Sequence, residues 1–171
     1  APTGKPRLPP NWSEISTMTI SYGHGLSSSP VHLAAGYASL LNGGTRVEPT
    51  LLRQDHAELG PRIVREAVRA RSRDMLRQVV ARGTASFGEV PGYEVGGKTG
   101  TADKPRAAGG GYYEDKVIST FATVFPANDP QYVLIVTLDE PSENSGDEPR
   151  RTAGWTAVPV AAEMIRRTAP L

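Results

Sequence analysis

The sequence contains no cysteine among its 171 residues. Disulfide bonds, thiolate chemistry and cysteine-ligated zinc sites are therefore excluded. Aromatic residues make up only 6% of the chain, and the formal net charge is +1. So small a net charge gives no overall field that would attract nucleic acid or an anionic membrane surface, and we expect no nucleic-acid partner.

Long apolar runs are also missing. No stretch approaches the ~18 apolar residues of a membrane-spanning helix, and no signal peptide opens the chain. If the natural protein is exported or anchored, we expect that part to lie outside this sequence. The length suits one domain with a real core, or one large piece of a bigger domain. The 15 prolines and 18 glycines indicate many turns and long connections.

Few residues suit metal binding. His24, His32 and His56 share no ligand spacing, and neither His-x-x-x-His nor Glu-x-x-His occurs. We therefore expect no metal site and no cofactor. His24 lies between two glycines, which predicts a tight, exposed turn that directs the imidazole toward a cleft. The alternative is a loop histidine without a role.

Three segments of the N-terminal half have readable patterns. Residues 1–12 are rich in proline, which predicts an extended connector, with Trp12 docking onto the body of the protein. Ser29 and Pro30 are a capping hydroxyl and a proline at the first helical position. They predict a core helix that ends at residues 42–44. Residues 45–53 suggest a short extended segment at a sheet edge.

Residues 62–82 carry seven arginines. Apolar residues recur among them with helical period and predict an amphipathic helix that ends at Gly83. The arginines fall mostly on the opposite face, which is usually solvated; the alternative is a docking surface for an acidic partner. The apolar stripe consists of Val68, Met75, Leu76, Val79 and Val80.

The C-terminal half reads as an antiparallel meander. Residues 93–102, 117–125 and 132–138 are predicted strands, and residues 126–130 form a turn short enough for a hairpin. Residues 103–113 are predicted to be a mobile loop, in which Tyr112 and Tyr113 either wall a cleft or anchor the loop. A final helix is predicted to start near Pro159, with an apolar stripe of Val158, Ala161, Ala162 and Ile165. The expected fold class is α+β, with a three-stranded antiparallel meander packed with helices.

The strand at residues 93–102 is where we expect chemistry. Alternation predicts Lys98 and Gly100 on one face and Thr99 and Thr101 on the other. A twist or bulge near the glycines would bring all four to one cleft. Such a set suits holding a carboxylate and polarising a carbonyl. Taken alone, Lys-Thr-Gly also fits a strand that ends in a solvated lysine and a turn.

Several segments occur in a specific joint order. They are residues 22–27 (Tyr-Gly-His-Gly-Leu-Ser) with the helix of 29–44, then 79–85 (Val-Val-Ala-Arg-Gly-Thr-Ala), 95–102, 125–127 (Phe-Pro-Ala), 138–141 (Leu-Asp-Glu-Pro) and 157–160 (Ala-Val-Pro-Val). In this order they resemble the C-terminal part of a penicillin-binding transpeptidase domain of the class B, cell-division type. The resemblance covers nearly the whole chain from Trp12 onward, and the fold it implies is a fragment of the penicillin-binding/serine β-lactamase-like fold.

The resemblance implies an incomplete active site. The family combines Ser-x-x-Lys, Ser-x-Asn and Lys-Thr-Gly motifs. No Ser-x-x-Lys occurs here, and Ser142-Glu143-Asn144 follows Lys98 instead of preceding it, so we interpret it as coincidence. We therefore expect residues 1–171 to be the C-terminal portion of a D,D-transpeptidase domain. On its own it would be inactive, because it lacks the nucleophile.

The resemblance also implies roles for individual residues. The substrate would be the terminal D-alanyl-D-alanine of a peptidoglycan stem peptide, and β-lactams would bind in its place. Lys98 and Thr101 are the expected catalytic residues, with the N–H of Thr101 forming half of the oxyanion hole. Thr99 and Thr101 would bind the carboxylate, and Gly100 would let the carbonyl approach. The further expected substrate-binding residues are His24, Tyr112 and Tyr113.

The remaining expectations concern place and partners. The resemblance implies the outer face of a bacterial inner membrane, with an anchor outside this chain, and cell-wall glycosyltransferase or division proteins as partners. An exposed edge at residues 132–138 predicts self-association. Two other functions stay open at this stage: a serine β-lactamase or D,D-carboxypeptidase relative, and a non-catalytic docking module that uses the arginine-rich helix.

Overall fold

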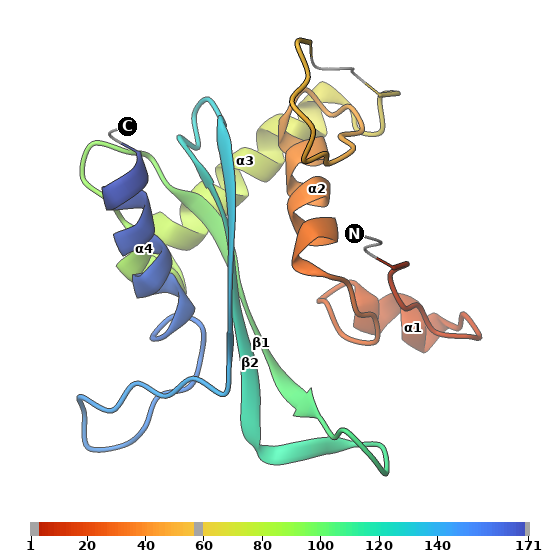
Figure 1. Ribbon diagram of the computed structural model, residues 1–171, viewed down its shortest axis with the longest axis vertical. Helices are drawn as coiled ribbons and strands as arrows, with labels where there is room; N and C mark the ends of the chain where they lie inside the picture. Colours follow the sequence, from red (N-terminus) through yellow and green to blue (C-terminus); the bar gives the residue numbers. More distant parts are fainter. Residues whose placement is uncertain (1–3, 57–59, 170–171) are drawn as a thin grey trace.

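The computed structural model describes residues 4–56 and 60–169. Two small helices and one long helix precede the sheet, and one helix follows it (Figure 1). No helix in these two ranges is long and apolar enough to cross a membrane. The elements in chain order are α1 (Glu14–Ile20), α2 (Pro30–Leu41), α3 (Glu66–Arg82), the 3-10 turn η1 (Ser86–Gly88), β1 (Gly96–Pro105), β2 (Tyr112–Phe125), β3 (Tyr132–Asp139) and α4 (Ala157–Thr168).

The sheet is the predicted meander, with strand order β1-β2-β3 and antiparallel pairing throughout. Helix α4 lies on one side of the sheet and α2 on the other, while α3 passes behind the start of β1 (Figure 1). Helix α1 lies apart from the sheet, beyond α2 (Figure 1). The expected α+β class and the three-stranded meander are confirmed.

The hydrophobic core lies between α4 and the facing side of the sheet. Phe121 of β2 is completely buried there, together with Val158 and Ile165 of α4. Alanines at 157, 161 and 162 let the helix approach the sheet closely, and all three are fully buried. The predicted apolar stripe of this helix is confirmed, and α4 begins at Ala157, two residues before Pro159.

Helix α2 begins as predicted, and α1 was not predicted at all. The Ser29 hydroxyl accepts a hydrogen bond from the His32 N–H, and Pro30 is the first helical residue. Most of α2 is only half-buried, so the expectation that it belongs to the core holds only in part. Trp12, just before α1, does not dock onto the body as expected: it is 58% exposed, and its Nε1 donates to the Thr17 hydroxyl of α1 at 2.9 Å.

The predicted loop at 103–113 is shorter than expected, because both of its ends belong to strands. β1 continues to Pro105 and β2 starts at Tyr112, so only residues 106–111 form the turn. Three glycines with positive φ, Gly109 to Gly111, make that turn, and their composition had suggested a longer loop. The predicted edge segment at 45–53 is paired only at its start, where Thr45 forms an antiparallel bridge with Arg62 and the Arg46 N–H donates to the Pro61 carbonyl at 3.0 Å.

Gly97 is required by the packing of β1 against β2. A Cβ atom at this position would lie 2.6 Å from the Ala122 carbonyl oxygen and 2.6 Å from the Phe121 ring. At Gly100, three residues along the same strand, the nearest atom would be the Thr120 oxygen at 3.9 Å. The two glycines therefore differ in the room that surrounds them.

We predict that Gly97→Ala destabilises the protein by about 1–3 kcal/mol, because the added methyl must displace a buried ring and a main-chain carbonyl. Gly100→Ala serves as the matched control and is expected to change the free energy of unfolding by less than about 0.5 kcal/mol. Urea denaturation followed by circular dichroism measures both. Equal stabilities for the two variants would contradict the close packing at Gly97.

Candidate functional site

The register of β1 places the four predicted site residues on alternate faces. Thr99 pairs with Phe121 and Thr101 with Ser119, so both threonines are on the side of the sheet that α4 covers. Lys98 and Gly100 are on the other side. The predicted alternation is confirmed. Of the twist or bulge predicted near the glycines, the bulge does not occur, because the register is unbroken from Gly96 to Asp103 and shifts only before Pro105.

The main-chain groups of Thr99 and Thr101 point toward an open edge. In an antiparallel ladder, successive residues direct their N–H and C=O groups alternately to the two neighbouring strands. The Glu140 N–H donates to the Val117 carbonyl at 2.9 Å, so odd-numbered residues of β2 bond to β3 and even-numbered ones to β1. The β1 residues that pair with odd-numbered β2 residues, Thr99 and Thr101 among them, therefore point their main-chain N–H and C=O groups away from β2. No further strand pairs with β1 in the ranges 4–56 and 60–169.

Each of the two threonine hydroxyls is held by a group outside β1. The Thr99 Oγ1 lies 2.8 Å from the Thr84 Oγ1, and either can be the donor. The Ala153 N–H donates to the Thr101 Oγ1 at 3.0 Å. The Thr101 hydroxyl oxygen therefore already accepts one hydrogen bond, and the hydroxyl proton can point outward to a ligand.

The Lys98 ammonium lies at the same edge. Its Nζ donates to the Thr99 carbonyl at 2.7 Å, and the side chain is exposed. A cation, an outward N–H at Thr101 and two fixed hydroxyls therefore gather along one open strand edge. This set of donors suits an anion such as a carboxylate, because charge-assisted hydrogen bonds are the strong ones.

Thr84 was not predicted as part of the site. It follows Gly83 at the end of α3, and its side chain is exposed. The only signal in the sequence was its place in the segment 79–85, one of those that carried the family resemblance. No spacing rule connects a residue after a helix to a strand that begins twelve positions later, so pattern analysis missed the contact with Thr99.

The structure does not bring the other predicted residues to this edge. In the described part of the chain, no hydrogen bond or aromatic contact joins His24 to β1; its ring stacks on Tyr22 with centroids 6.5 Å apart. Gly23 and Gly25 have φ of 93° and 89°, as the predicted tight turn requires. The Tyr113 ring packs under Lys116, whose Nζ is 5.1 Å from its centroid. Tyr112 is 52% exposed at the start of β2.

An ion-pair network fixes the far end of β1. Lys104 donates to Asp139 and Glu140, both at 2.7 Å, and Lys116 lies 3.0 Å from Glu140. A hydrogen bond from Lys104, and to a smaller extent one from Lys116, lowers the pKa of the Glu140 carboxyl. Hydrogen bonds to Asp139 and Glu140 raise the pKa of Lys104. The network spans all three strands at the end opposite Gly97, so it orients β1 without entering the site.

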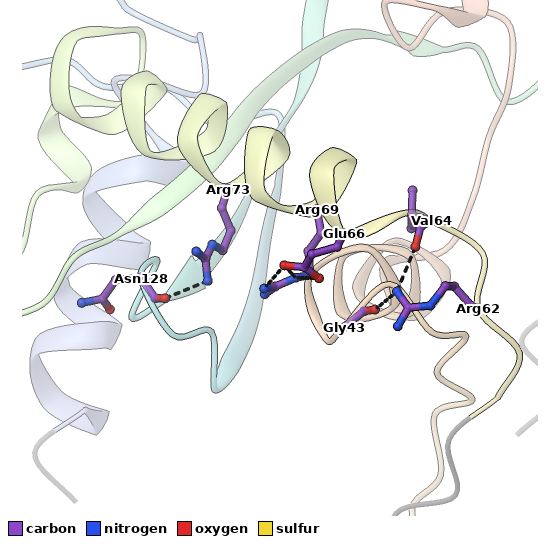
Figure 2. Close-up of polar contacts among 7 residues, drawn as sticks. All are labelled: Gly43, Arg62, Val64, Glu66, Arg69, Arg73 and Asn128. Atoms are coloured by element: carbon purple, nitrogen blue, oxygen red, sulfur yellow. Dashed lines mark hydrogen bonds and ion pairs between the residues drawn. The ribbon is translucent and has the colours of Figure 1, made fainter.

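The charged face of α3 was expected to be solvated, and this expectation is wrong for three of its arginines. Arg69, Arg73 and Arg77 are half-buried, at intervals of four residues, and they bond to the protein itself. Figure 2 shows Arg73 reaching the Asn128 carbonyl, at 2.8 Å, and Arg69 paired with Glu66. Arg77 donates to the Glu89 carboxylate at 2.6 Å and 2.9 Å, and to the Val95 carbonyl at 3.0 Å. These three side chains are not a free docking surface.

Comparison with known proteins gives a consistent result. Residues 3–164 match the family described as the penicillin binding protein transpeptidase domain. The chain is 34% identical, over 178 aligned positions, to the probable peptidoglycan D,D-transpeptidase FtsI of Caulobacter vibrioides. The alignment covers 98% of this chain but only 30% of that protein.

Solved structures agree with the sequence comparison. The apo transpeptidase domain of Burkholderia pseudomallei penicillin-binding protein 3 superposes with a TM-score of 0.83 at 33% identity, covering 96% of this chain and 49% of that one. Penicillin-binding protein 3 of Mycobacterium tuberculosis, complexed with aztreonam, gives a TM-score of 0.76 at 30% identity, covering 95% of this chain and 40% of that one. The chain thus spans less than half the length of these relatives.

The α3 contacts predict a difference between two arginines of the same helix. Arg77→Ala is expected to destabilise the protein by about 1–2 kcal/mol, because it leaves Glu89 and the Val95 carbonyl without their donor. Arg71 is exposed, and Arg71→Ala should change the stability by less than about 0.5 kcal/mol. Thermal unfolding of the two variants measures the difference. A partner-docking role without structural contacts would leave both melting temperatures unchanged.

Proposed function

We propose that this chain, which belongs to the penicillin-binding protein transpeptidase domain family, forms the carboxylate-binding and carbonyl-polarising side of a peptidoglycan D,D-transpeptidase site. The observation that carries the proposal is the open edge of β1, where Lys98, the Thr101 N–H and the hydroxyls of Thr99 and Thr101 gather. The chain spans about 30% of its FtsI relative, so the complete activity depends on residues outside it.

The substrate that fits this edge is an extended peptide with a free C-terminal carboxylate. Such a peptide adds to β1 as a strand, using the outward main-chain groups of Thr99 and Thr101. Its carboxylate accepts hydrogen bonds from the threonine hydroxyls beside the Lys98 ammonium. The terminal D-alanyl-D-alanine of a stem peptide has these features, and the complexes of the M. tuberculosis relatives with aztreonam and ampicillin support β-lactams as ligands of the same site.

The reaction requires a serine nucleophile that this chain does not carry. The serine oxygen attacks the carbonyl of the penultimate D-alanine, the terminal D-alanine leaves, and an amine of a second stem peptide then displaces the serine. The Thr101 N–H stabilises the oxyanion in both steps, a contribution of about 3–4 kcal/mol for one such donor. The Lys98 ammonium favours proton movement through the serine of a Ser-x-Asn motif supplied by the rest of the domain.

Location and partners follow from this role. We place the chain on the outer face of a bacterial inner membrane, where peptidoglycan is cross-linked, with an anchor outside this sequence. Cell-wall glycosyltransferase or division proteins are its proposed partners. A β-lactamase or D,D-carboxypeptidase would transfer the acyl group to water instead. The relatives matched over nearly the whole chain are transpeptidases, which favours cross-linking over hydrolysis.

Labelling with a fluorescent penicillin tests the proposed function. We expect no covalent labelling of the isolated chain and ready labelling of the complete protein that carries it. In the complete protein, Lys98→Ala should slow acylation by about a hundredfold, because a charged donor at the reacting centre is lost. Lys104→Ala, which removes a lysine of the far ion-pair network, is the matched control and should label at the parental rate.

Two outcomes would contradict this assignment. Labelling of the isolated chain would show that it carries its own nucleophile. Rapid turnover of the penicillin by the complete protein, with release of hydrolysed product, would favour the β-lactamase alternative.

We also propose self-association of the isolated chain through β3. Within the described residues this strand pairs only with β2, so the main-chain groups of Val133, Ile135 and Thr137 point to an open edge. A second copy offers the same edge and can pair with it antiparallel.

Sedimentation velocity tests this proposal. The chain is expected to form dimers as its concentration rises. Thr137→Pro removes one outward N–H without breaking the β2–β3 ladder, and it should weaken the dimer while leaving the circular dichroism spectrum unchanged. A strictly monomeric profile of the parental chain at high concentration would count against pairing through this edge.

A further inference from the structure

Thr84 is placed to control a hydroxyl that the proposed site uses. Its Oγ1 lies 2.8 Å from the Thr99 Oγ1, and Thr84 is exposed while Thr99 is half-buried. Thr84 comes from the end of α3 and Thr99 from the middle of β1, fifteen positions later. The contact therefore joins two elements and is not a consequence of local chain geometry.

The backbone around Thr84 is held from two directions. The N–H groups of Gly83 and Ala85 both donate to the Val79 carbonyl at 3.1 Å, and Ala85 is fully buried. On the other side, a Cβ atom at Gly154 would lie 2.6 Å from the Thr84 carbonyl oxygen, so the segment before α4 packs directly against it. Because this main chain is fixed, the Thr84 hydroxyl meets Thr99 at a defined position.

The same segment before α4 also holds the second hydroxyl of the site. Ala153, the neighbour of Gly154, donates its N–H to the Thr101 Oγ1 at 3.0 Å. The two threonines of β1 are thus each supported by a group from the elements that flank the strand. For Thr101 the direction of the hydrogen bond is determined, since a main-chain N–H can only donate.

For the Thr84–Thr99 pair the direction depends on what binds. Each hydroxyl has one proton, so either can donate to the other. A carboxylate beside Thr99 accepts the Thr99 proton, and Thr84 must then donate to Thr99. Hydrogen bonds in such a chain polarise one another, which strengthens the one to the anion.

We propose that Thr84 is a positioning residue for substrate binding: by donating its hydroxyl proton to Thr99, it directs the Thr99 proton toward the carboxylate of the substrate or β-lactam. This inference rests on the proposed function, because it assumes that a carboxylate binds at the β1 edge. It adds a residue outside the Lys-Thr-Gly strand to the recognition of the anion. Thr84 does not itself touch the substrate.

The test uses the complete protein that carries this chain and compares two ligands. One is a penicillin with its free carboxylate and the other is the methyl ester of the same penicillin. Three variants are made: Thr84→Val, which keeps the shape and removes the hydroxyl, Thr84→Ser, which keeps the hydroxyl, and Thr99→Val. The second-order rate constant of acylation is measured for each ligand, together with the melting temperature of each variant.

The expected result is specific to the charged ligand. Thr84→Val should slow acylation by the carboxylate form about three- to tenfold, the size expected for one hydrogen bond, and should leave the rate with the ester unchanged. Thr84→Ser should restore the parental rate. In a Thr99→Val background, Thr84→Val should have no further effect, because the residue acts only through the Thr99 hydroxyl.

The opposing results are distinct. Equal slowing with both ligands, or failure of Thr84→Ser to restore the rate, would show that Thr84 only supports the fold. An unchanged rate of Thr84→Val with the carboxylate form would also overturn the inference. If the parental protein is not acylated, or does not distinguish the acid from its ester, the proposed carboxylate site itself is wrong, and that failure is seen before any variant is compared.

Discussion

The close approach of β1 to the Phe121 ring is the constraint on which the rest of the structure depends. Only a residue without a side chain at position 97 lets the ring lie under the strand, between the sheet and α4. With the ring in place, α4 packs through its alanines, and the loop before it comes close enough for Ala153 to reach Thr101. The geometry of the proposed site is thus set by the core and not by the exposed residues that form it.

Alternation along the strand settles how the site is built. No bulge gathers the four residues on one face, so they meet at the strand edge, where side chains from both faces and the outward main-chain groups are within reach of one extended ligand. An edge strand usually invites unwanted pairing. Here, in our proposal, the open edge of β1 is the binding surface for a peptide.

Much of this could be predicted from the sequence, because the signals were local. The cap at Ser29, the apolar stripe of α4 and the two later strands depend on short-range patterns. The contacts of Arg73 and Arg77 could not be predicted, since the helical pattern shows which face is charged but not that main-chain carbonyls at Asn128 and Val95 lie opposite it. Thr84 was missed for the same reason: its partner is distant in sequence. The glycines at 109–111 led to the prediction of too long a loop, because the composition of a short glycine-rich turn resembles that of a long loop.

The bond from Lys98 to the Thr99 carbonyl has an electrostatic consequence. That acceptor is uncharged, whereas Lys104 and Lys116 face carboxylates in the network at the far end of the sheet. In the described part of the chain, the Lys98 charge is therefore not neutralised by an ion pair. An approaching anion experiences a local positive potential at the β1 edge although the chain as a whole is almost neutral. The binding of the anion should then weaken as ionic strength rises, mainly because the association rate falls and less because the lifetime of the complex changes.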